Sequence, residues 1–216
     1  MAVERDVTHV LVMAKAPQPG EVKTRLMPAL SASQAAEIAR AALEDTLAAV
    51  RRCAASRHIV ALAGDRGPWL GDGFEVLAQR GTTFTERLTD AWAYAGAPGI
   101  QIGMDTPQIT AELLDDALAR LAHGRDDALV GPACDGGWWA LGLRAPIGGV
   151  FDGVPMSRVD TGERQVARLR ELGLRVGLLP ELRDIDEPDD LAAVAAGFPH
   201  LRVAAAARRF DAEMVP

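Results

Sequence analysis

The segment HVLVMAKAPQPGEVKTRL, residues 9–26, contains an apolar run followed at once by a polar loop with two prolines and a glycine. The apolar run at residues 9–14 is typical of a short buried strand that ends where the prolines begin. Residues 31–54 then form an Ala-rich segment, and Ser31 with Gln34 has the pattern of a capping box at the start of a helix. A strand, a loop and a long helix in this order indicate an α/β fold.

The same alternation continues along the rest of the chain. Short apolar runs predict further strands at residues 59–63, 74–78, 100–103, 128–131, 138–143 and 174–179. Helical patterns predict helices at residues 85–94, 110–121, 161–172 and about 184–196, with N-caps at Thr85, Thr110, Thr161 and Asp186. This order predicts a mostly parallel sheet with helices on both faces.

The chain contains no internal repeat, low-complexity segment or linker that would divide it. We therefore expect one domain over residues 1–216, with a core at about 8–197 and a tail, 198–216, that is partly helical or loose. A length of 216 residues fits a single α/β domain.

The composition excludes several classes of protein. The net charge of −7 argues against non-specific nucleic-acid binding, which needs a broad basic surface. The two cysteines, Cys53 and Cys134, have neither metal-ligand nor disulfide spacing, and the four histidines form no zinc motif. No stretch approaches the ~20 apolar residues of a membrane span, and the run at residues 10–14 is too short for a signal peptide. We expect a cytoplasmic protein that contacts neither nucleic acid nor membrane.

Three cations, Lys15, Lys23 and Arg25, lie within eleven residues of this acidic chain, in the loop after the first strand. In parallel sheets, ligands bind beyond the carboxyl ends of the strands, which is where this loop lies. A loop stiffened by prolines and carrying cations suits a polyphosphate, although it lacks the spacing of a Walker loop. The alternative is a solvated surface loop. The candidate nucleotide-binding residues are Lys15, Pro17, Gly20, Lys23, Thr24 and Arg25.

Acidic residues in two places are candidate metal ligands. Asp105 ends the fourth strand just before Pro107, where one carboxylate would hold Mg²⁺ or Mn²⁺ between phosphates. Asp184 and Asp186 precede the expected last helix of the core and could also reach a metal. The alternatives are an Asx turn at Asp105 and an N-cap at Asp186, with Pro188 in the first helical turn.

Two further motifs are candidates for substrate binding. In the Asp135-Gly136-Gly137-Trp138-Trp139 segment, the two glycines allow the backbone either to approach a ligand closely or to form a tight turn between strands. If residues 138–143 form a strand, Trp138 and Trp139 point to opposite faces, and we expect both to be core. The second motif is Glu86-Arg87, for which a solvated helix face is the default. The region at residues 156–161 carries only a weak signal.

Taken in order, these motifs resemble one family, the DUF2064 proteins, which are often labelled arsenosugar-biosynthesis glycosyltransferases or radical-SAM/selenodomain-associated transferases. The likeness covers roughly residues 8–195. It rests on the opening motif at residues 15–26, on Asp45-Thr46, Glu86-Arg87, Asp105-x-Pro107, Asp135-Gly136-Gly137, and the closing motif at residues 184–191. The usual Gly-Ser-Asp-Ser-Pro reads Gly-Met-Asp-Thr-Pro at residues 103–107, so Met104 replaces a small polar residue.

The resemblance implies a three-layer α/β/α sandwich of the GT-A type, found in the nucleotide-diphospho-sugar transferases. It also implies a likeness to molybdenum-cofactor and 2-phospholactate guanylyltransferases. On that basis, nucleotide phosphates are expected at Lys15, Lys23 and Arg25, and a metal at Asp105.

Three functions fit these motifs. The first is nucleotidyl transfer from a nucleoside triphosphate to a small acidic acceptor, with Lys23, Arg25 and Asp105 as the catalytic residues. The second is glycosyl transfer from a nucleotide sugar, with Glu86, Asp135 or Asp184 as candidate bases. The third is a nucleotide-binding module without catalysis. We favour the first, because a sugar transferase more often carries Asp-x-Asp where this chain has Asp-x-Pro.

Overall fold

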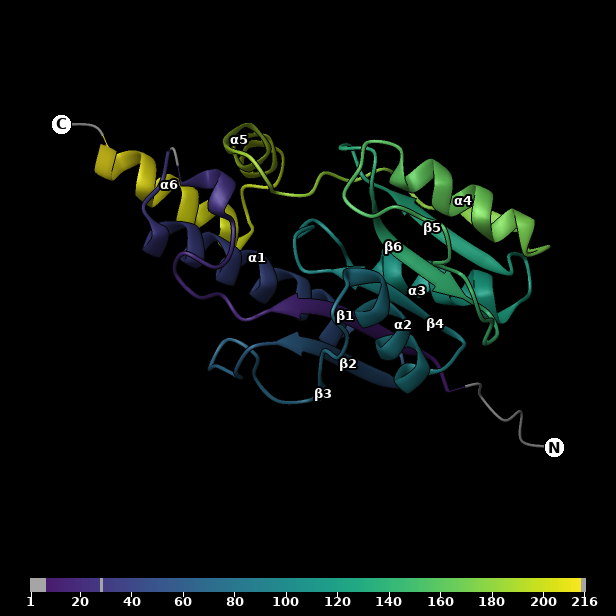
Figure 1. Ribbon diagram of the computed structural model, residues 1–216. Helices are drawn as coiled ribbons and strands as arrows, with labels where there is room; N and C mark the ends of the chain where they lie inside the picture. The colour runs from purple at the N-terminus through teal and green to yellow at the C-terminus, as the bar shows by residue number, and fades with distance from the viewer. Residues whose placement is uncertain (1–6, 28, 215–216) are drawn as a thin grey trace.

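A computed structural model describes residues 7–27 and 29–214 of the chain, with side chains up to residue 210. In this part of the chain, seven strands form one sheet (Figure 1). The strands are β1 (His9–Lys15), β2 (Arg57–Ala63), β3 (Glu75–Ala78), β4 (Gly99–Gly103), β5 (Ala128–Pro132), β6 (Trp138–Leu143) and β7 (Val176–Leu178).

The strand order is β3-β2-β1-β4-β6-β5-β7. β1 is parallel to both β2 and β4, and β5 is parallel to β7. β6 is antiparallel to its neighbours β4 and β5. The sheet is therefore mixed but mostly parallel, which confirms the predicted fold class, and β1 lies near its centre.

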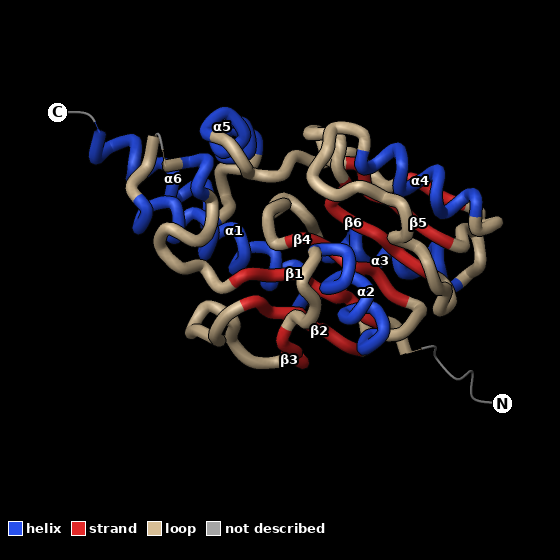
Figure 2. The backbone as a smooth tube through the Cα atoms, in the orientation of Figure 1, coloured by secondary structure: helices blue, strands red, loops and turns tan. Residues whose placement is uncertain are grey.

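Helices cover both faces of this sheet (Figure 2). One face packs against α1 and α3, and the other packs against α2 and α4. A short 3₁₀ helix, η1 (Thr24–Leu26), follows the loop after β1. The α-helices are α1 (Ala32–Arg52), α2 (Phe84–Ala95), α3 (Ala111–Ala122), α4 (Thr161–Glu171), α5 (Pro188–Gly197) and α6 (Arg202–Met214).

The apolar run of β1 is buried on both faces, as its lack of polar alternation predicts. Val10 and Val12 pack in the cluster shared with α1 and α3, whereas Leu11 and Met13 pack in the cluster shared with α2 and α4. Burying each such side chain contributes about 1.5–3 kcal/mol to the stability of the fold. The central strand is thus held from both sides, and its carboxyl end is a rigid base for the loop that follows.

The tail is helical over α6, Arg202–Met214. α6 packs against α1 and α5, and Val203, Ala206 and Phe210 join the same buried cluster as Ile38 of α1. Leu26 of η1 is also part of this cluster. The tail therefore supports the helix and the loop beside the carboxyl end of β1.

The N-terminal caps of α1 and α3 confirm the predictions. The Ser31 hydroxyl accepts a hydrogen bond from the Gln34 backbone amide, and the Gln34 side chain accepts one from the Ser31 amide. Thr110 caps α3 by accepting a hydrogen bond from the Leu113 amide. Such caps typically contribute ~1 kcal/mol each.

Three predicted caps are wrong. α2 is capped by Thr83 instead of Thr85, because Glu86 completes a capping box with Thr83. Thr161 does not cap α4, since its buried hydroxyl donates to the Pro155 carbonyl and accepts from the Arg158 amide. Asp160 holds the cap position there, and its carboxylate pairs with arginines.

The third wrong cap is Asp186. α5 begins at Pro188 with Glu187 at the cap position, and Asp190 accepts hydrogen bonds from the amides of Asp186 and Glu187. Because Asp190 satisfies these amides, the Asp186 carboxylate points elsewhere and pairs with cations. None of the helices in the described residues is both long enough and apolar enough to cross a membrane.

Candidate functional site

A cavity of about 540 Å³ opens where β1, β4 and β5 end. Lys15 is the last residue of β1, Asp105 follows β4, and Asp135 follows β5, and all three line this cavity. The carboxyl ends of neighbouring parallel strands meet at one edge of a sheet, so side chains far apart in sequence are brought together there. Asp186 lines the same cavity from the segment before α5.

The loop after β1 forms one wall of the cavity. The Lys15 ammonium donates a hydrogen bond to the Glu21 carbonyl at 2.9 Å, which closes the loop on itself. Lys23 has a φ of 48° and a ψ of 38°, a left-handed conformation that is uncommon outside glycine. Leu26, fully buried, anchors the end of this wall, while the Arg25 side chain remains 69% exposed.

Lys23 forms the charged centre of the site. Its ammonium lies 2.6 Å from Oδ1 of Asp105 and 3.0 Å from Oδ1 of Asp186, and its side chain is only 5% exposed. Burial alone would lower the pKa of Lys23, but the carboxylates of Asp105 and Asp186 outweigh that effect and raise this pKa above its usual value. Lys23 is therefore charged in the folded chain.

Backbone contacts fix the two carboxylates relative to each other. The Ile185 amide donates to the Asp105 carbonyl at 2.9 Å, and the Gln108 side chain donates to the Arg183 carbonyl at 2.8 Å. The Cys134 amide donates to the Leu182 carbonyl at 2.9 Å. The segment at residues 182–186 is thus tied to the loops after both β4 and β5.

Asp184 lies beside this centre but faces a different neighbour. Its Oδ1 accepts a hydrogen bond from the Thr106 hydroxyl at 2.5 Å. Burial, together with the charges of Asp105 and Asp135, raises the pKa of Asp184 to about 7 against the opposing hydrogen bond from Thr106 and the charge of Lys23. Asp184 lines a smaller adjoining cavity of about 230 Å³, together with Asp186 and Arg183.

Met104, the departure from the usual family motif, has a defined place. It is buried, and its sulfur accepts a hydrogen bond from the Lys15 amide at 3.1 Å. The thioether therefore links the loop after β4 to the end of β1, where a small polar side chain would be too short to fill the same space.

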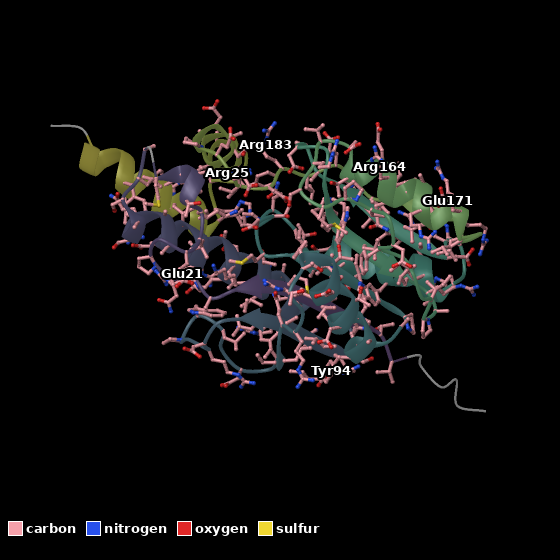
Figure 3. All side chains as sticks on the ribbon, viewed as in Figure 1. Glu21, Arg25, Tyr94, Arg164, Glu171 and Arg183 are labelled. Atoms are coloured by element: carbon pink, nitrogen blue, oxygen red, sulfur yellow. The ribbon has the colours of Figure 1, made fainter. Side chains whose placement is uncertain are left out.

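The predicted nucleotide-binding residues divide into two groups. Lys15, Lys23, Thr24 and Arg25 line the cavity, whereas Pro17 and Gly20 do not. Gly20 has a φ of 79°, the left-handed conformation that glycine favours, so it shapes the turn. Arg25 lies at the α5 end of the molecule, on the same side as Arg183 (Figure 3).

The predicted substrate-binding pair Glu86-Arg87 lies outside the residues that line the cavity. Oε2 of Glu86 accepts hydrogen bonds from the amide and hydroxyl of Thr82 and from the Thr83 amide, which lower the pKa of this carboxyl. Arg87 donates to the Gly81 carbonyl. Both side chains are engaged in shaping the start of α2.

In the Asp135-Gly136-Gly137-Trp138 segment, Asp135 lines the cavity, and its Oδ1 accepts a hydrogen bond from the Gly137 amide at 2.8 Å. Trp138 stacks on Phe151 at 6.3 Å between ring centroids, away from the residues that line the cavity. Trp139 is buried on the opposite face and donates to the Pro180 carbonyl. Both tryptophans pack with the core, as predicted.

The acidic residues do not form a ready-made metal cage. In the part of the chain that the structure describes, no group of three or more His, Cys, Asp or Glu side chains is arranged to hold a metal ion. Asp105 and Asp186 do converge, because both approach the same Lys23 ammonium. Their side chains are 37% and 39% exposed, so both can be reached from the cavity.

The opposite wall of the cavity carries only a weak signal in the sequence. Ser157, Arg158 and Val159 line it, in the loop before α4. No local motif marks these residues. Their position depends on backbone packing against the loop after β5, which a single sequence does not reveal.

The structure resembles solved transferases. A crystal structure described as a "putative nucleotide-diphospho-sugar transferase" from Desulfovibrio desulfuricans G20 is 30% identical, with a TM-score of 0.86 and 95% of each chain covered. A nucleotidyl transferase from Methanothermobacter thermautotrophicus is 16% identical, with a TM-score of 0.58, and covers 90% of this chain and 99% of its own.

The third solved structure is the Rv0371c protein of Mycobacterium tuberculosis H37Rv in complex with manganese. It is 17% identical, with a TM-score of 0.53, and covers 87% of this chain and 97% of its own. At such identities the two more distant structures show a shared fold alone. Curated proteins provide no match to the chain.

The comparison with protein families covers most of the site. A family described as "Uncharacterized protein conserved in bacteria (DUF2064)" matches residues 18–158, which include Lys23, Asp105 and Asp135. The match spans more than half of the chain and agrees with the resemblance of the motifs. The chain belongs to the DUF2064 family.

Proposed function

We propose that this chain is a metal-dependent, nucleotide-using transferase that moves a nucleotidyl group from a nucleoside triphosphate to a small acidic acceptor. The observation that carries the proposal is the convergence of two carboxylates and three cations on one cavity. The carboxylates of Asp105 and Asp186 both contact the Lys23 ammonium. Lys15 and Arg25 line the same cavity. Cations opposite a carboxylate pair match a polyphosphate with its bound divalent ion.

The carboxylate pair fits Mg²⁺ or Mn²⁺. Both ions prefer oxygen ligands, and Mg²⁺ is commonly held by one or two carboxylates with phosphate oxygens and water completing its shell. Asp105 and Asp186 would hold the ion, and Asp184 is a third candidate nearby. When bound, the ion would supply positive charge that neutralises the phosphates. A fold shared with a protein solved as a manganese complex is consistent with this assignment.

The cations of the loop would stabilise the leaving group. An acceptor oxygen forms a bond to the α-phosphorus, the bond from that phosphorus to the bridging oxygen breaks, and pyrophosphate leaves. Lys15 and Arg25 would bind the phosphates as charge gathers on the pyrophosphate, and Lys23 would contribute positive charge beside Asp105. Because these groups are fixed by the fold, positioning and electrostatics supply the catalysis.

An acidic acceptor suits the site because each of the three bases considered for glycosyl transfer already accepts a hydrogen bond from the chain. A phosphate, phosphonate or carboxylate is already ionised at neutral pH, so its attack needs no proton acceptor. A sugar hydroxyl does need one. Of the three bases considered for glycosyl transfer, Glu86 lies in a capping box away from the cavity and Asp184 already accepts from Thr106. Asp135 lines the cavity but accepts from the Gly137 amide.

Glycosyl transfer is the second candidate. The observation in its favour is the description of the Desulfovibrio desulfuricans G20 relative as a nucleotide-diphospho-sugar transferase. Both candidates require the same cations and the same metal, so the nature of the donor separates them.

A thermal-shift panel of nucleoside triphosphates and matching nucleotide sugars, with and without Mg²⁺ or Mn²⁺, tests the proposal. We expect a triphosphate with metal to raise the melting temperature more than its nucleotide sugar, and candidate acidic acceptors to release pyrophosphate. Stabilisation by a nucleotide sugar and by no triphosphate would establish glycosyl transfer instead. Tight binding without turnover of either donor would indicate a binding module.

Two arginine variants serve as a matched pair in this panel. Arg25 lines the cavity, so Arg25→Ala should weaken triphosphate binding by about 1–3 kcal/mol, the range for charge-assisted contacts. Arg87 donates to a backbone carbonyl away from the cavity, so Arg87→Ala should bind as the parent does. The reverse pattern would place the nucleotide at α2.

A further inference from the structure

The cavity has two opposed walls that share a backbone feature. In the described residues, Lys23 and Ser157 are the two non-glycine residues with a positive φ, at 48° and 60°. Both line this cavity, Lys23 on the wall after β1 and Ser157 on the wall before α4. Non-glycine residues adopt this conformation rarely, and such positions cluster where a ligand is held. The second wall is therefore a candidate for binding as well.

The second wall is held firmly in place. The Gly162 amide donates to the Gly136 carbonyl at 2.8 Å, and a Cβ on Gly136 would lie only 2.0 Å from the Val159 carbonyl oxygen. The Thr161 hydroxyl donates to the Pro155 carbonyl at 2.8 Å and accepts from the Arg158 amide at 3.0 Å. These contacts fix the backbone of Arg158 relative to the loop after β5, which carries Asp135.

Arg158 supplies the positive charge of this wall. Its side chain is 63% exposed, and its Nε donates to Oδ1 of Asp160 at 3.2 Å, the acceptor that it contacts among the described residues. That contact restrains the guanidinium and leaves its two terminal nitrogens without an acceptor among the described residues. Guanidinium groups bind phosphate and carboxylate in a two-pronged geometry.

The charges between the walls indicate which ligand Arg158 meets. The carboxylates of Asp105, Asp135 and Asp186 lie in the cavity and would repel an anionic acceptor. The cations of the first wall are positioned for the nucleotide phosphates. An acceptor that enters on the side of the second wall needs a cation there, and Arg158 is the cation that lines this wall.

We propose that Arg158 binds the anionic group of the acceptor and so determines that the acceptor carries a phosphate, phosphonate or carboxylate. This inference rests on the proposed function. Ser157 positions the arginine through its left-handed backbone, and Asp160 orients the guanidinium.

Arg164 offers a matched control. It pairs with the other oxygen of the same Asp160 carboxylate at 2.6 Å, but it lies on α4 and outside the residues that line the cavity (Figure 3). Arg158→Ala and Arg164→Ala therefore each remove one arginine from Asp160, but Arg158→Ala alone of the two also removes a residue that lines the cavity.

The test is calorimetric titration of inorganic phosphate into the wild-type protein and both variants. Each is first saturated with Mg²⁺ and an α,β-methylene analogue of the triphosphate that stabilises the chain most. We expect phosphate affinity to fall at least tenfold in Arg158→Ala and to stay within twofold in Arg164→Ala, with the affinity for the triphosphate analogue unchanged in both. Arg158→Lys should recover part of the phosphate affinity, because it keeps the charge and loses the two-pronged geometry.

Several outcomes would overturn the inference while leaving the proposed function intact. They are triphosphate binding without phosphate binding in the wild type, equal phosphate affinity in the two variants, and a loss of triphosphate affinity in Arg158→Ala. The last would place Arg158 on the nucleotide. If no triphosphate binds, the proposed function fails. Phosphate titration into the nucleotide-free proteins then tests Arg158 alone: a loss confined to Arg158→Ala supports it, and equal affinities refute it.

Discussion

Lys23 and Arg158 are both cations that line one cavity, yet their surroundings differ sharply. The Lys23 side chain is 5% exposed and lies between two carboxylates, whereas Arg158 is 63% exposed and contacts one carboxylate. Lys23 lies among Asp105, Asp184 and Asp186, and we call these four residues the buried centre after the buried lysine side chain, since the Asp105 and Asp186 side chains are 37% and 39% exposed. Arg158 and Asp160 belong to an exposed rim.

This difference predicts which substitutions lower the stability of the fold and which lower ligand affinity. The Lys23 ammonium interacts strongly with its carboxylates because its own side chain is buried, so changing it alters the stability of the fold. Exposed ion pairs contribute roughly 0–1 kcal/mol, so changing one at the rim should alter binding while the fold survives.

The largest expected effect concerns Asp184 and pH. Its pKa is about 7 in the folded chain and roughly 3.9 in an unfolded chain, so the folded state binds more protons between these values. Stability therefore falls as pH rises through this window, by on the order of 4 kcal/mol in full. Asp184→Asn should remove this loss and be more stable than the wild type at pH 8, measured by urea unfolding in EDTA.

Measuring both proteins from pH 4.5 to 8 covers the range in which Asp184 binds a proton in the folded state alone, and comparing their slopes cancels the contribution of His9, which both proteins share. Burial lowers the pKa of His9 to about 4, so this residue costs stability only as the pH falls below its unfolded value near 6.5. If the wild type and Asp184→Asn show the same slope across the window, Asp184 is ionised in the fold and the centre is better solvated than described.

The second prediction concerns the lysine of the centre. Lys23→Met removes the cation that separates Asp105 and Asp186, and should cost about 3 kcal/mol of unfolding free energy, the low end for breaking a buried pair. Because Asp105 then loses its cationic partner and Asp186 keeps Arg25 alone, at 3.5 Å, Mn²⁺ should raise the melting temperature of the variant more than that of the wild type.

Lys15→Met is the control for this substitution. Its ammonium is 3.6 Å from the Glu21 carboxylate and about half exposed, so the change should cost less than about 1 kcal/mol. Equal losses in the two lysine variants would remove the distinction between the buried centre and the exposed rim.

The third prediction concerns the contact that positions the rim. Gly136→Ala places a Cβ 2.0 Å from the Val159 carbonyl oxygen at a φ of 86°, so the wall must shift. We expect a loss of about 2–3 kcal/mol together with weaker phosphate binding at Arg158. Gly153→Ala has a similar φ of 72° but no atom within 4 Å, and should lose about 1–2 kcal/mol from backbone strain alone. Equal losses of unfolding free energy in the two variants would show that the segment before α4 moves away from the new Cβ at no cost.

Most of the fold could be predicted from the sequence, because strand and helix periodicity survive without tertiary information. The strands at residues 9–14 and 138–143 were predicted closely. The errors were local, at caps where two neighbouring residues compete. Thr83 caps α2 because Glu86 lies three positions later, a signal present in the sequence. No such signal marks Thr161, because its hydrogen bond to the Pro155 carbonyl depends on how the loop before α4 folds.

The site was predictable on one wall and not on the other. Lys15, Lys23, Arg25 and Asp105 stand out by spacing after predicted strands, and the structure places all four on one cavity. The burial of Lys23 between carboxylates was not predictable, because Asp186 is 163 residues away. Arg158 could not be found either, since its place depends on a backbone contact between Gly136 and Val159.

The proposed function requires that Asp105 and the cations beside it bind a nucleoside triphosphate with a divalent ion. Calorimetric titration of the triphosphate into wild type and Asp105→Asn, each in Mg²⁺ and in EDTA, tests it most directly. We predict that Mg²⁺ tightens binding about tenfold in the wild type, or about 1.4 kcal/mol, and has no effect on Asp105→Asn. The same gain from Mg²⁺ in both proteins, or no triphosphate binding to either, would contradict the account.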